Sequence, residues 1–448
     1  MRIGFDSDLL RDVYLSPSMA ELFAARRQLQ AWLDVEAALA RAQARLGLVP
    51  TTAAEEISRR AVADELDLDA YRAGLREALH PIVPMVRLLT AACEGDAGQY
   101  VHWGATTQDI MDTAMVLQLR EANQLIAREL TRCREASARL AARHRDDVMP
   151  GRTHGQHAVP ITFGYKAAVW LDELDRHRVA LERAAEDLRV VQFGGAAGTL
   201  ASLGPDGLDV RRELAAELDL AEPRITWHVA RDRLVALGGV QAGIALFLQR
   251  LSREVALLQG TEMAEVAEPF HHGKVGSSTM PHKRNPVLCE TVFSLSVLVQ
   301  DAYRTLMTAS VQQHERDMAT WQLEWDAVPR LWVYQHRALG LAADVLEGLH
   351  VDRDRMRANV ELTDGLIMSE STMMRLAPSI GRQEAHDVVY DAAMAAFEER
   401  RPLADVVAAD PRLAALEDAR SLAQPESVVD AAGRLVDDVL AAGDQEPK

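Results

Sequence analysis

The segment VLQLREANQLIARELTRCREASARLAARHR, residues 116–145, decides the fold class of this chain. Apolar residues recur in it at steps of three and four: Leu119, Ala122, Ile126, Leu130, Cys133, Ala136 and Leu140. This spacing predicts one apolar face on a helix roughly 40 Å long, at about 1.5 Å per residue. Similar patterns occur at 22–47, 163–190, 229–266, 287–313 and 328–348. Because strand signals are few, we expect an all-α protein built on a bundle of long helices.

Composition supports a folded, helix-rich protein. The chain has 448 residues, of which 48% are hydrophobic, 26% charged and only 5% aromatic, so it suits two or three domains. Its formal charge of −18 argues against nucleic acid or an anionic membrane as the main partner. An anionic ligand would therefore have to be met by a local positive site.

The cysteines and the apolar runs indicate a cytoplasmic protein. Cys93, Cys133 and Cys289 lie far apart and without metal-site spacing, which is a reduced, intracellular pattern. The N-terminal MRIGFDSDLL has no apolar signal core. The longest apolar run, LVALGGVQAGIALFL at 234–248, is interrupted by Gln241 and several glycines, which favours a buried helix over a membrane span.

Glycine- and proline-rich interruptions divide the helical pattern. They are GRTHGQHAVP (151–160), FGGAAGTLASLGPDG (193–207) and HHGKVGSSTMPHKRNP (271–286), with a softer break near 349–366. We predict three helical domains: an N-terminal domain (1–100), a central long-helix domain with the active-site segments (101–348) and a C-terminal cap (349–448). The wide apolar stripes also predict an oligomer.

Three polar turns are candidates for chemistry. GATTQD (104–109) places Thr106 and Thr107 before a long helix, where a threonine can cap the helix and the helix end can also bind a carboxylate. His154 lies in a polar turn that could expose a general acid or base to a ligand. GSSTMPHKRNP (276–286) adds hydroxyls and cations. A carboxylate-rich substrate would explain all three turns.

Two other readings of these turns are disfavoured. FGGAAGT lacks the G-x-G-x-x-G spacing of dinucleotide-binding loops, and its glycines are better explained by close backbone approach or a mobile turn. The histidine pairs have no HExxH motif or cysteine pair to complete a zinc site: His154 with His157, and His271 with His272. We therefore predict neither a metal nor a cofactor.

The three turns together resemble the fumarase/aspartase superfamily. The last one matches every fixed position of its pattern G-S-S-x-M-P-x-K-x-N-P, and GATTQDIMDTA and GRTHGQHAVPITFG resemble its other two active-site segments, in the same order. GRQEAHDVVYDA resembles the C-terminal cap of the adenylosuccinate lyase branch. The resemblance covers most of the chain. It implies a homotetramer around a central bundle of many helices, active sites each shared by three subunits, and anti β-elimination from a succinyl-type substrate that releases fumarate.

The resemblance also implies roles for individual residues. Ser277 would be the general base, and Lys283 and Asn285 would hold the substrate carboxylate as negative charge develops on it. His154 would protonate or polarise the leaving group, with Glu290 as its orienting partner. The remaining substrate contacts would be Thr106, Thr107, Thr153, Ser278, Met280 and Arg316. The partner is then a small dicarboxylate, and the glycine-flanked loop would close over it.

The branch within the superfamily is mixed. PHKRNP resembles adenylosuccinate lyases and 3-carboxy-cis,cis-muconate cycloisomerases, while WGATTQD, TWHVARDR and HERDMATWQLEW look more like the cycloisomerases. Bacterial cycloisomerases typically have Trp after GRT, however, and this chain has His154, which fits an enzyme that handles a leaving group. We therefore predict a carbon–nitrogen lyase acting on an N-substituted aspartate or a nitrosuccinate-like compound.

Three alternatives stay open. The first is a 3-carboxy-cis,cis-muconate cycloisomerase. The second is a housekeeping adenylosuccinate lyase, although the Ser/His run usual after the Glu-Arg-Asp motif is replaced here by Met318 and Ala319. The third is a catalytically silent structural homologue, which would have no reason to retain the whole set of Ser277, His154, Lys283, Asn285 and Glu290.

Overall fold

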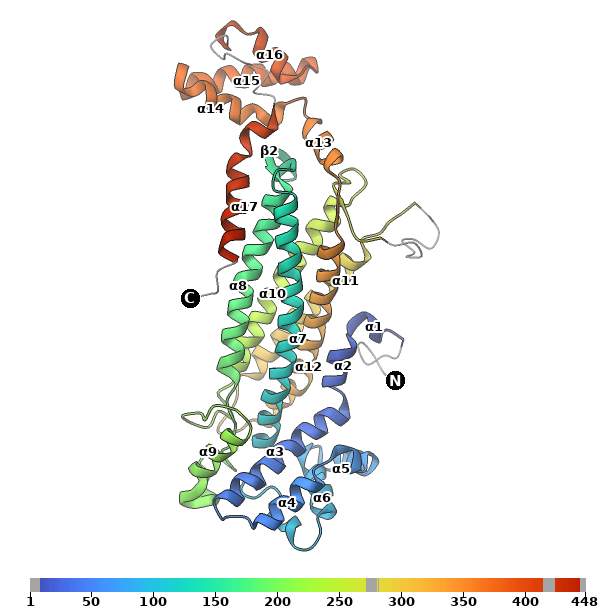
Figure 1. Ribbon diagram of the computed structural model, residues 1–448, viewed down its shortest axis with the longest axis vertical. Coiled ribbons are helices and arrows are strands. Elements are labelled where there is room, and N and C mark those ends of the chain that lie inside the picture. The colour runs from blue at the N-terminus through green and yellow to red at the C-terminus, as the bar shows by residue number, and fades with distance from the viewer. Residues whose placement is uncertain (1–8, 271–279, 281, 414–423, 444–448) are drawn as a thin grey trace. The chain divides into compact units, whose positions relative to one another are not determined.

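The computed structural model describes residues 9–270, 280, 282–413 and 424–443, which form mostly α-helix (Figure 1). The long helices are α3 (Ala25–Arg45), α7 (Thr107–Arg143), α8 (Phe163–Leu188), α10 (Asp232–Leu258), α11 (Val287–Ala309) and α12 (Met318–Gly348). Named strands in the described part of the chain form two antiparallel pairs: β1 (Val148–Thr153) with β2 (Gln156–Thr162), and β3 (Val266–Ala267) with β4 (His350–Val351). The predicted all-α class is confirmed.

Two compact units make up the chain. Unit 1 consists of Met1–Glu129, His177–Leu246 and Ser294–Leu339, and unit 2 of Leu130–Arg176, Phe247–Phe293 and Gly340–Lys448. The boundaries fall inside α7, α8, α10, α11 and α12, so each of these helices contributes residues to both units. The predicted domains 1–100, 101–348 and 349–448 stay a prediction.

The apolar stripe of residues 116–145 is the buried face of α7. All seven of its predicted positions are at most 7% exposed. Within unit 1, Trp332 of α12 donates its indole N–H to Asn123 Oδ1 of α7 at 2.8 Å. Gly238 of α10 lies so close to α11 that a Cβ there would be 2.8 Å from Leu306 Cδ2. Such interlocked helices form the long-helix core that the spacing predicted.

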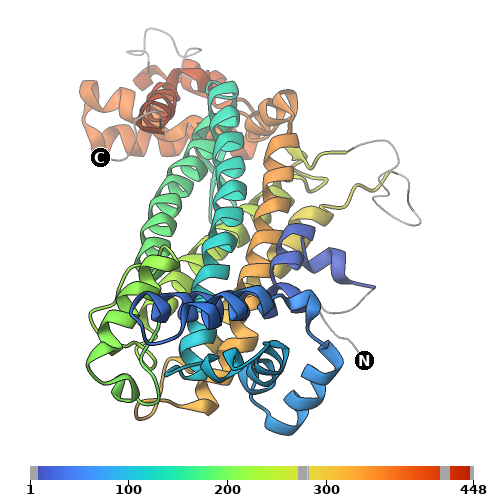
Figure 2. The same ribbon diagram turned by 60° about the horizontal axis from the view of Figure 1, so that its bottom comes forward.

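Shorter helices of unit 1 gather around α3, which runs crosswise to α7 (Figure 2). Partly exposed salt bridges join α3 to α9, with Arg41 Nε 2.7 Å from Glu217 and Arg45 Nε 2.8 Å from Glu213. The crossing brings the middle of α3 to the first turns of α7. The short helices of the unit are α1 (Arg11–Tyr14), α2 (Pro17–Leu22), α4 (Thr51–Arg60), α5 (Leu68–Ala78), α6 (Ile82–Ala92) and α9 (Gly207–Glu217).

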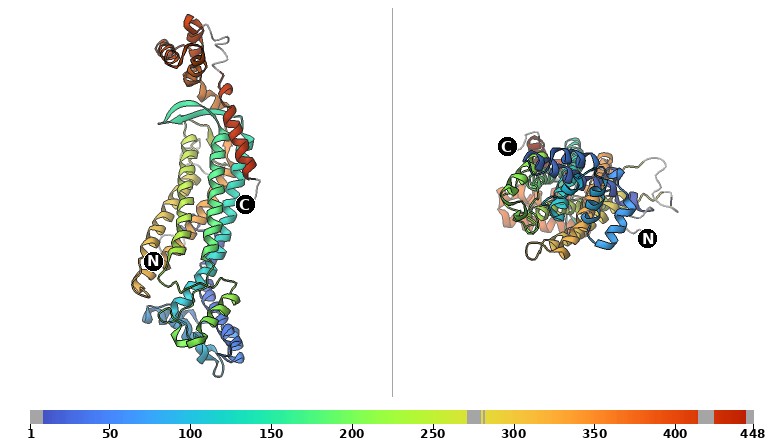
Figure 3. Two further views of the ribbon diagram at one scale, coloured as in Figure 1. Left: turned by 90° about the vertical axis from the view of Figure 1, so that its left-hand side faces the viewer. Right: turned by 90° about the horizontal axis from the view of Figure 1, so that it is seen from below.

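Unit 2 carries a hairpin and a helical cap. The hairpin β1–β2 connects α7 to α8 (Figure 3). The cap has its own buried apolar cluster, which includes Leu376, Val388 and Leu403. The helices of this region are α13 (Arg353–Glu361), α14 (Ser369–Ile380), α15 (Arg382–Glu399), α16 (Leu403–Ala409) and α17 (Asp430–Gly443).

Among the described helices, α10 alone is long and apolar enough to cross a membrane. Its most apolar 18-residue window has a mean hydropathy of 1.5, and 56% of that window is buried inside the protein. The core helix of a soluble bundle meets the same criteria, and the interruptions at Gln241 and the glycines agree with the buried helix predicted from the sequence.

Candidate functional site

The amino end of α7 carries the two threonines predicted to bind a carboxylate. Thr107 is the first residue of the helix, and Thr106 precedes it at the N-cap. The Thr106 backbone N–H donates to Asp109 Oδ2 at 2.9 Å, and the Asp109 N–H donates to the Thr106 carbonyl at 3.0 Å. This reciprocal cap uses only the backbone of Thr106. Neither threonine hydroxyl bonds to another described residue, so both half-buried side chains are available to a ligand.

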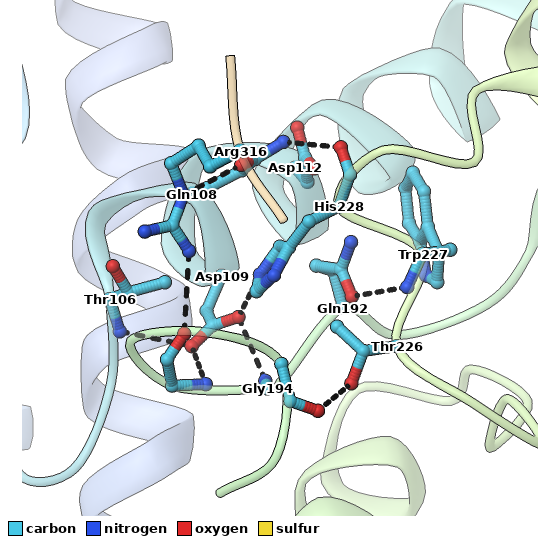
Figure 4. A network of polar contacts seen from close by, with 12 residues as sticks. Thr106, Gln108, Asp109, Asp112, Gln192, Gly194, Thr226, Trp227, His228 and Arg316 are labelled. Carbon is cyan, nitrogen blue, oxygen red and sulfur yellow. Dashed lines mark hydrogen bonds and ion pairs between the residues drawn. The ribbon is translucent and has the colours of Figure 1, made fainter. Parts of the chain in front are cut away.

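Asp109 also fixes the glycine-rich loop FGGAAGT against α7 (Figure 4). Its Oδ1 accepts hydrogen bonds from the Gly194 N–H at 2.9 Å and from His228 Nε2 at 2.7 Å, and its Oδ2 accepts one from the Gly195 N–H at 2.9 Å. A Cβ at Gly194 would lie 2.5 Å from the methyl of Thr226, and Gly195 has a φ of +68°. Close approach of the backbone to Thr226 therefore explains Gly194, and the left-handed backbone conformation explains Gly195.

Arg316 lies beside the amino end of α7, where it contacts Gln108, a residue 208 positions earlier in the chain. Its Nε–H donates to Gln108 Oε1 at 3.0 Å, and a terminal nitrogen donates to the Ala196 carbonyl at 2.9 Å. A guanidinium, two hydroxyls and a helix amino end together suit a carboxylate. We call this set the α7 corner, and its members are Thr106, Thr107, Gln108, Asp109 and Arg316.

Two histidines that sequence reasoning missed lie next to the α7 corner. His102 Nδ1 is 2.6 Å from Glu36 Oε1, and its backbone N–H donates to Glu36 Oε2 at 3.2 Å. Burial lowers the pKa of His102, but the buried Glu36 carboxylate outweighs burial and leaves that pKa raised. Burial lowers the pKa of His80, and the charges of Arg316 and His102 lower it further. His102, four residues before Thr106, could have been noticed, whereas His80 had no sequence signal.

A buried ion cluster joins the segments that carry the corner. Arg231, which is 2% exposed, donates to Glu324 Oε1 at 2.9 Å and to Asp112 Oδ2 at 2.7 Å. Arg231 thereby ties α12, which follows Arg316, to the second turn of α7. Two carboxylates share one guanidinium here. Burial raises the pKa of Glu324, because the charged carboxylate loses its hydration. The attraction of Arg231 opposes that rise without cancelling it.

We expect Glu324→Gln to remove a pH-dependent loss of stability. Because the folded pKa of Glu324 is raised above its ordinary value of 4.5, the folded chain keeps a proton that the unfolded chain has lost. The free energy of unfolding therefore falls as pH rises above that value. In denaturant unfolding, the free energy of unfolding of the variant minus that of the wild type should increase as the pH rises above 4.5. The increase should be at most about 1.4 kcal/mol per pH unit. Glu361→Gln, at an exposed position, serves as the control. If the difference in free energy of unfolding between Glu324→Gln and the wild type is the same at every pH, as expected for the control, the prediction is wrong.

In unit 2, His154 occupies the tip of the β1–β2 hairpin. Thr153 pairs with Gln156, and the two residues between them, His154 and Gly155, have φ values of +54° and +74°. Positive φ at both positions defines a type I′ turn, which suits a right-twisted hairpin. Thr153 and His154 are both exposed, so the imidazole is presented outward from a regular element.

The hairpin is anchored by a buried ion pair. Arg152 contacts both carboxylate oxygens of Glu265, at 2.9 and 2.5 Å, and Glu265 is 0% exposed. Asn359 of α13 donates to the same carboxylate at 2.8 Å. Because the anchor begins one residue before Thr153, the strands carry the tip in a fixed orientation within unit 2.

The predicted loop residues reach the start of α11. Ser277 and Ser278 lie outside the described residues. Of the others, Asn285 is half-buried, and three are exposed: Met280, Lys283 and Glu290. The amino end of α11 is capped by Glu268, which accepts from the N–H groups of Leu288 at 3.1 Å and Cys289 at 2.6 Å. Glu290 lies in the first turn of the same helix.

The structure therefore gathers the predicted residues into groups. Unit 1 brings together Thr106, Thr107 and Arg316. Unit 2 carries Thr153 and His154 on one hairpin, with the residues from Met280 to Glu290 at the start of α11. The joining of these groups into one site and the pairing of His154 with Glu290 stay predictions. Within the described ranges, no three or more His, Cys, Asp or Glu side chains are placed to hold a metal ion.

Comparison with known sequences decides the family. A profile described as lyase matches residues 14–300, and one described as the adenylosuccinate lyase C-terminus matches residues 365–439. The chain belongs to this lyase family. The resemblance to the fumarase/aspartase superfamily, drawn from three short motifs, is thereby confirmed over most of the chain.

Named relatives of this lyase family member differ in activity. A 3-carboxy-cis,cis-muconate cycloisomerase of Pseudomonas aeruginosa is 43% identical over 90% of this chain and 88% of its own length. An N-acetyl-S-(2-succino)cysteine lyase of Enterococcus italicus is 39% identical over 98% of this chain and 96% of its own length. The crystal structure of fumarate lyase from Mesorhizobium sp. BNC1 matches with a TM-score of 0.89 and 43% identity, covering 96% and 98% of the two chains. The chain is therefore an enzyme of the fumarate lyase superfamily.

Proposed function

We propose that this enzyme removes the substituent from C2 of a succinyl compound by β-elimination and releases fumarate. The observation that carries the proposal is the imidazole of His154, held outward on an anchored turn where an acid can meet a leaving group. The α7 corner supports it with a guanidinium and two unused hydroxyls, which suit one of the two substrate carboxylates.

The proposed reaction assigns each residue one task. Ser277, deprotonated to its alkoxide with the help of nearby cations and amides, takes the proton from C3 of the substrate and becomes the alcohol, and the electron pair is delocalised into the adjacent carboxylate as an enediolate. Lys283 and Asn285 hold that carboxylate, because their positive charge and N–H donors stabilise the growing negative charge. The carbanion then forms the double bond as the bond from C2 to the heteroatom breaks. His154, oriented by Glu290, gives its proton to the departing atom.

Assembly of the site between subunits is part of the proposal. The long helices present exposed apolar side chains that a second copy could cover: Leu246 at 58%, Leu257 at 62%, Val297 at 44% and Met307 at 41% exposed. Burial of such surface drives association. We infer a homotetramer in which three subunits contribute to each site, working in the cytoplasm.

The departing atom distinguishes three candidate functions. Nitrogen is the first candidate: the amine of an N-substituted aspartate agrees best with an acid at His154, because an amine leaves poorly as its anion, whereas nitrosuccinate would release nitrite, which needs no proton. Sulfur is a second candidate, favoured by the relative named N-acetyl-S-(2-succino)cysteine lyase. The cycloisomerase reaction is a third, favoured by the relative from Pseudomonas aeruginosa.

A substrate panel tests the proposal directly. Purified protein would be mixed with adenylosuccinate, argininosuccinate, nitrosuccinate, aspartate, an S-succinyl thiol and 3-carboxymuconate, and fumarate would be followed by its ultraviolet absorbance. We expect fumarate from at least one succinyl compound, which would also identify the departing atom. Consumption of carboxymuconate without fumarate from any other compound would replace the proposed lyase by a cycloisomerase.

A further inference from the structure

Unit 1 contains a small aromatic cavity that the proposed reaction does not use. Its volume is about 50 Å³, and three tryptophans contribute to its wall: Trp32 of α3, and Trp321 and Trp325 of α12. A single water needs roughly 10–15 Å³ on this measure. The cavity therefore has room for a group of a few heavy atoms, and its walls are suited to an apolar one.

The cavity lies close to the α7 corner. Trp321 donates its indole N–H to Asp112 Oδ1 at 3.3 Å, so one wall belongs to the second turn of α7. On another side, the ring of His80 meets Trp321 edge-on, with ring centroids 6.5 Å apart. Asp112 follows Gln108 and Asp109 by about one turn of α7, so one turn of helix separates the cavity wall from the α7 corner.

The charges at the cavity disfavour an anion. Asp112 and Glu324 are the ionisable side chains in its lining, and Lys and Arg are absent from the described lining residues. Both acids bond to the single guanidinium of Arg231, so this nearby cation is already engaged. A phosphate or carboxylate placed here would find no cation among the described lining residues to offset the loss of its hydration.

One polar group in the wall is unsatisfied. The indole Nε1–H of Trp325 is buried and has no hydrogen-bond partner in the described protein. A buried donor without a partner costs about 1–3 kcal/mol.

We propose that this cavity binds an uncharged, apolar end of the leaving group, such as a short alkyl or acyl chain. The inference rests on the proposed function and narrows its substrate class. The substrate would be a succinyl compound whose substituent ends in about three or four uncharged heavy atoms. A substituent that ends in phosphate, as in a nucleotide, would be excluded.

Binding of inert substrate analogues tests this inference. Succinate and 2-alkylsuccinates, whose carbon substituent cannot be eliminated, would be titrated into the full-length protein by calorimetry. From 2-methylsuccinate to 2-propylsuccinate we expect the affinity to rise about fourfold per methylene, with no further gain at 2-hexylsuccinate. A phosphonate at the end of the propyl chain should abolish that gain.

Variants locate the effect. Met115 also lines the cavity, so Met115→Phe should fill it and remove the gain from propyl, while Trp325→Leu should enlarge it and move the optimum to a longer chain. Trp170→Phe changes a buried tryptophan of α8 outside the cavity and should leave the series unchanged. The wild-type series is decisive even where a variant fails to fold.

The outcomes separate the two proposals. Succinate binding without any gain from alkyl chains, or a gain that neither cavity variant alters, would overturn the apolar subsite and leave the proposed function intact. No binding of succinate or of any alkylsuccinate would overturn both.

Discussion

Replacing Ser277 with alanine is expected to reduce fumarate release by about 10³-fold, the range over which a positioned base accelerates a reaction. Alanine has no group that can accept the proton from C3, and no other residue of the motif is assigned that task. The measurement is the steady-state rate of absorbance change with the best substrate of the panel. Because the change removes only one hydroxyl, we expect the oligomer to keep its size in light scattering.

The neighbouring serine supplies a matched control for this assignment. Ser278→Ala removes the same atom from a residue that the motif makes a substrate contact, so we expect a higher KM and a smaller loss of kcat. If Ser278→Ala instead abolishes turnover while Ser277→Ala retains it, the base lies one residue further along the chain. Wild-type turnover in both variants would rule out the motif as the source of the base.

Replacing His154 with asparagine is expected to slow elimination of a weakly basic nitrogen by about 10²-fold or more, because the proton donor is lost. Asparagine is the suitable replacement because it tolerates the left-handed conformation that His154 adopts, with φ at +54°. An N-arylaspartate and an S-succinyl thiol would be compared. A thiol has a pKa of about 8.5 and leaves as its anion, so the sulfur substrate should be affected much less.

The pattern of losses identifies the role of the histidine. Gln156→Ala, an exposed change on the same hairpin, should leave both rates near those of the wild type. Equal losses on nitrogen and sulfur substrates in His154→Asn would mean that His154 binds substrate without acting as an acid. Unchanged rates on both would move the acid elsewhere, and His102 would be the next residue to replace.

The long helices could be predicted because their periodicity is local, whereas the hairpin was missed. Residues 151–160 were interpreted as a turn, yet β1 and β2 pair through them. Pro150 stands opposite Pro160 in the register, and proline has no N–H to donate, so these residues argue against strands when they are read one at a time. The Arg152–Glu265 pair that anchors the hairpin joins residues 113 apart, and sequence spacing alone does not reveal such a pair.

The α7 corner was predicted only in part. Thr106 and Thr107 stand out locally, because hydroxyls precede a long helix. Arg316 was placed with them through the superfamily resemblance, since nothing local links it to Gln108. The dyad of His102 and Glu36 was missed because Glu36 lies within the apolar pattern of a helix, and its partner becomes known only when α3 crosses α7.

The exposed tip of the hairpin separates the chemistry of residue 154 from the stability of the protein. A side chain that is exposed and makes no core contact can be exchanged at little cost in folding free energy. The left-handed backbone at that position adds a conformational cost that depends on the residue. It favours glycine, asparagine, aspartate and histidine over β-branched residues. Divergence at this one turn could therefore change how a leaving group is handled while the helices and the carboxylate contacts persist. During evolution, a substitution at residue 154 could therefore change the reaction from elimination to isomerisation, or the reverse, while the helical fold is retained.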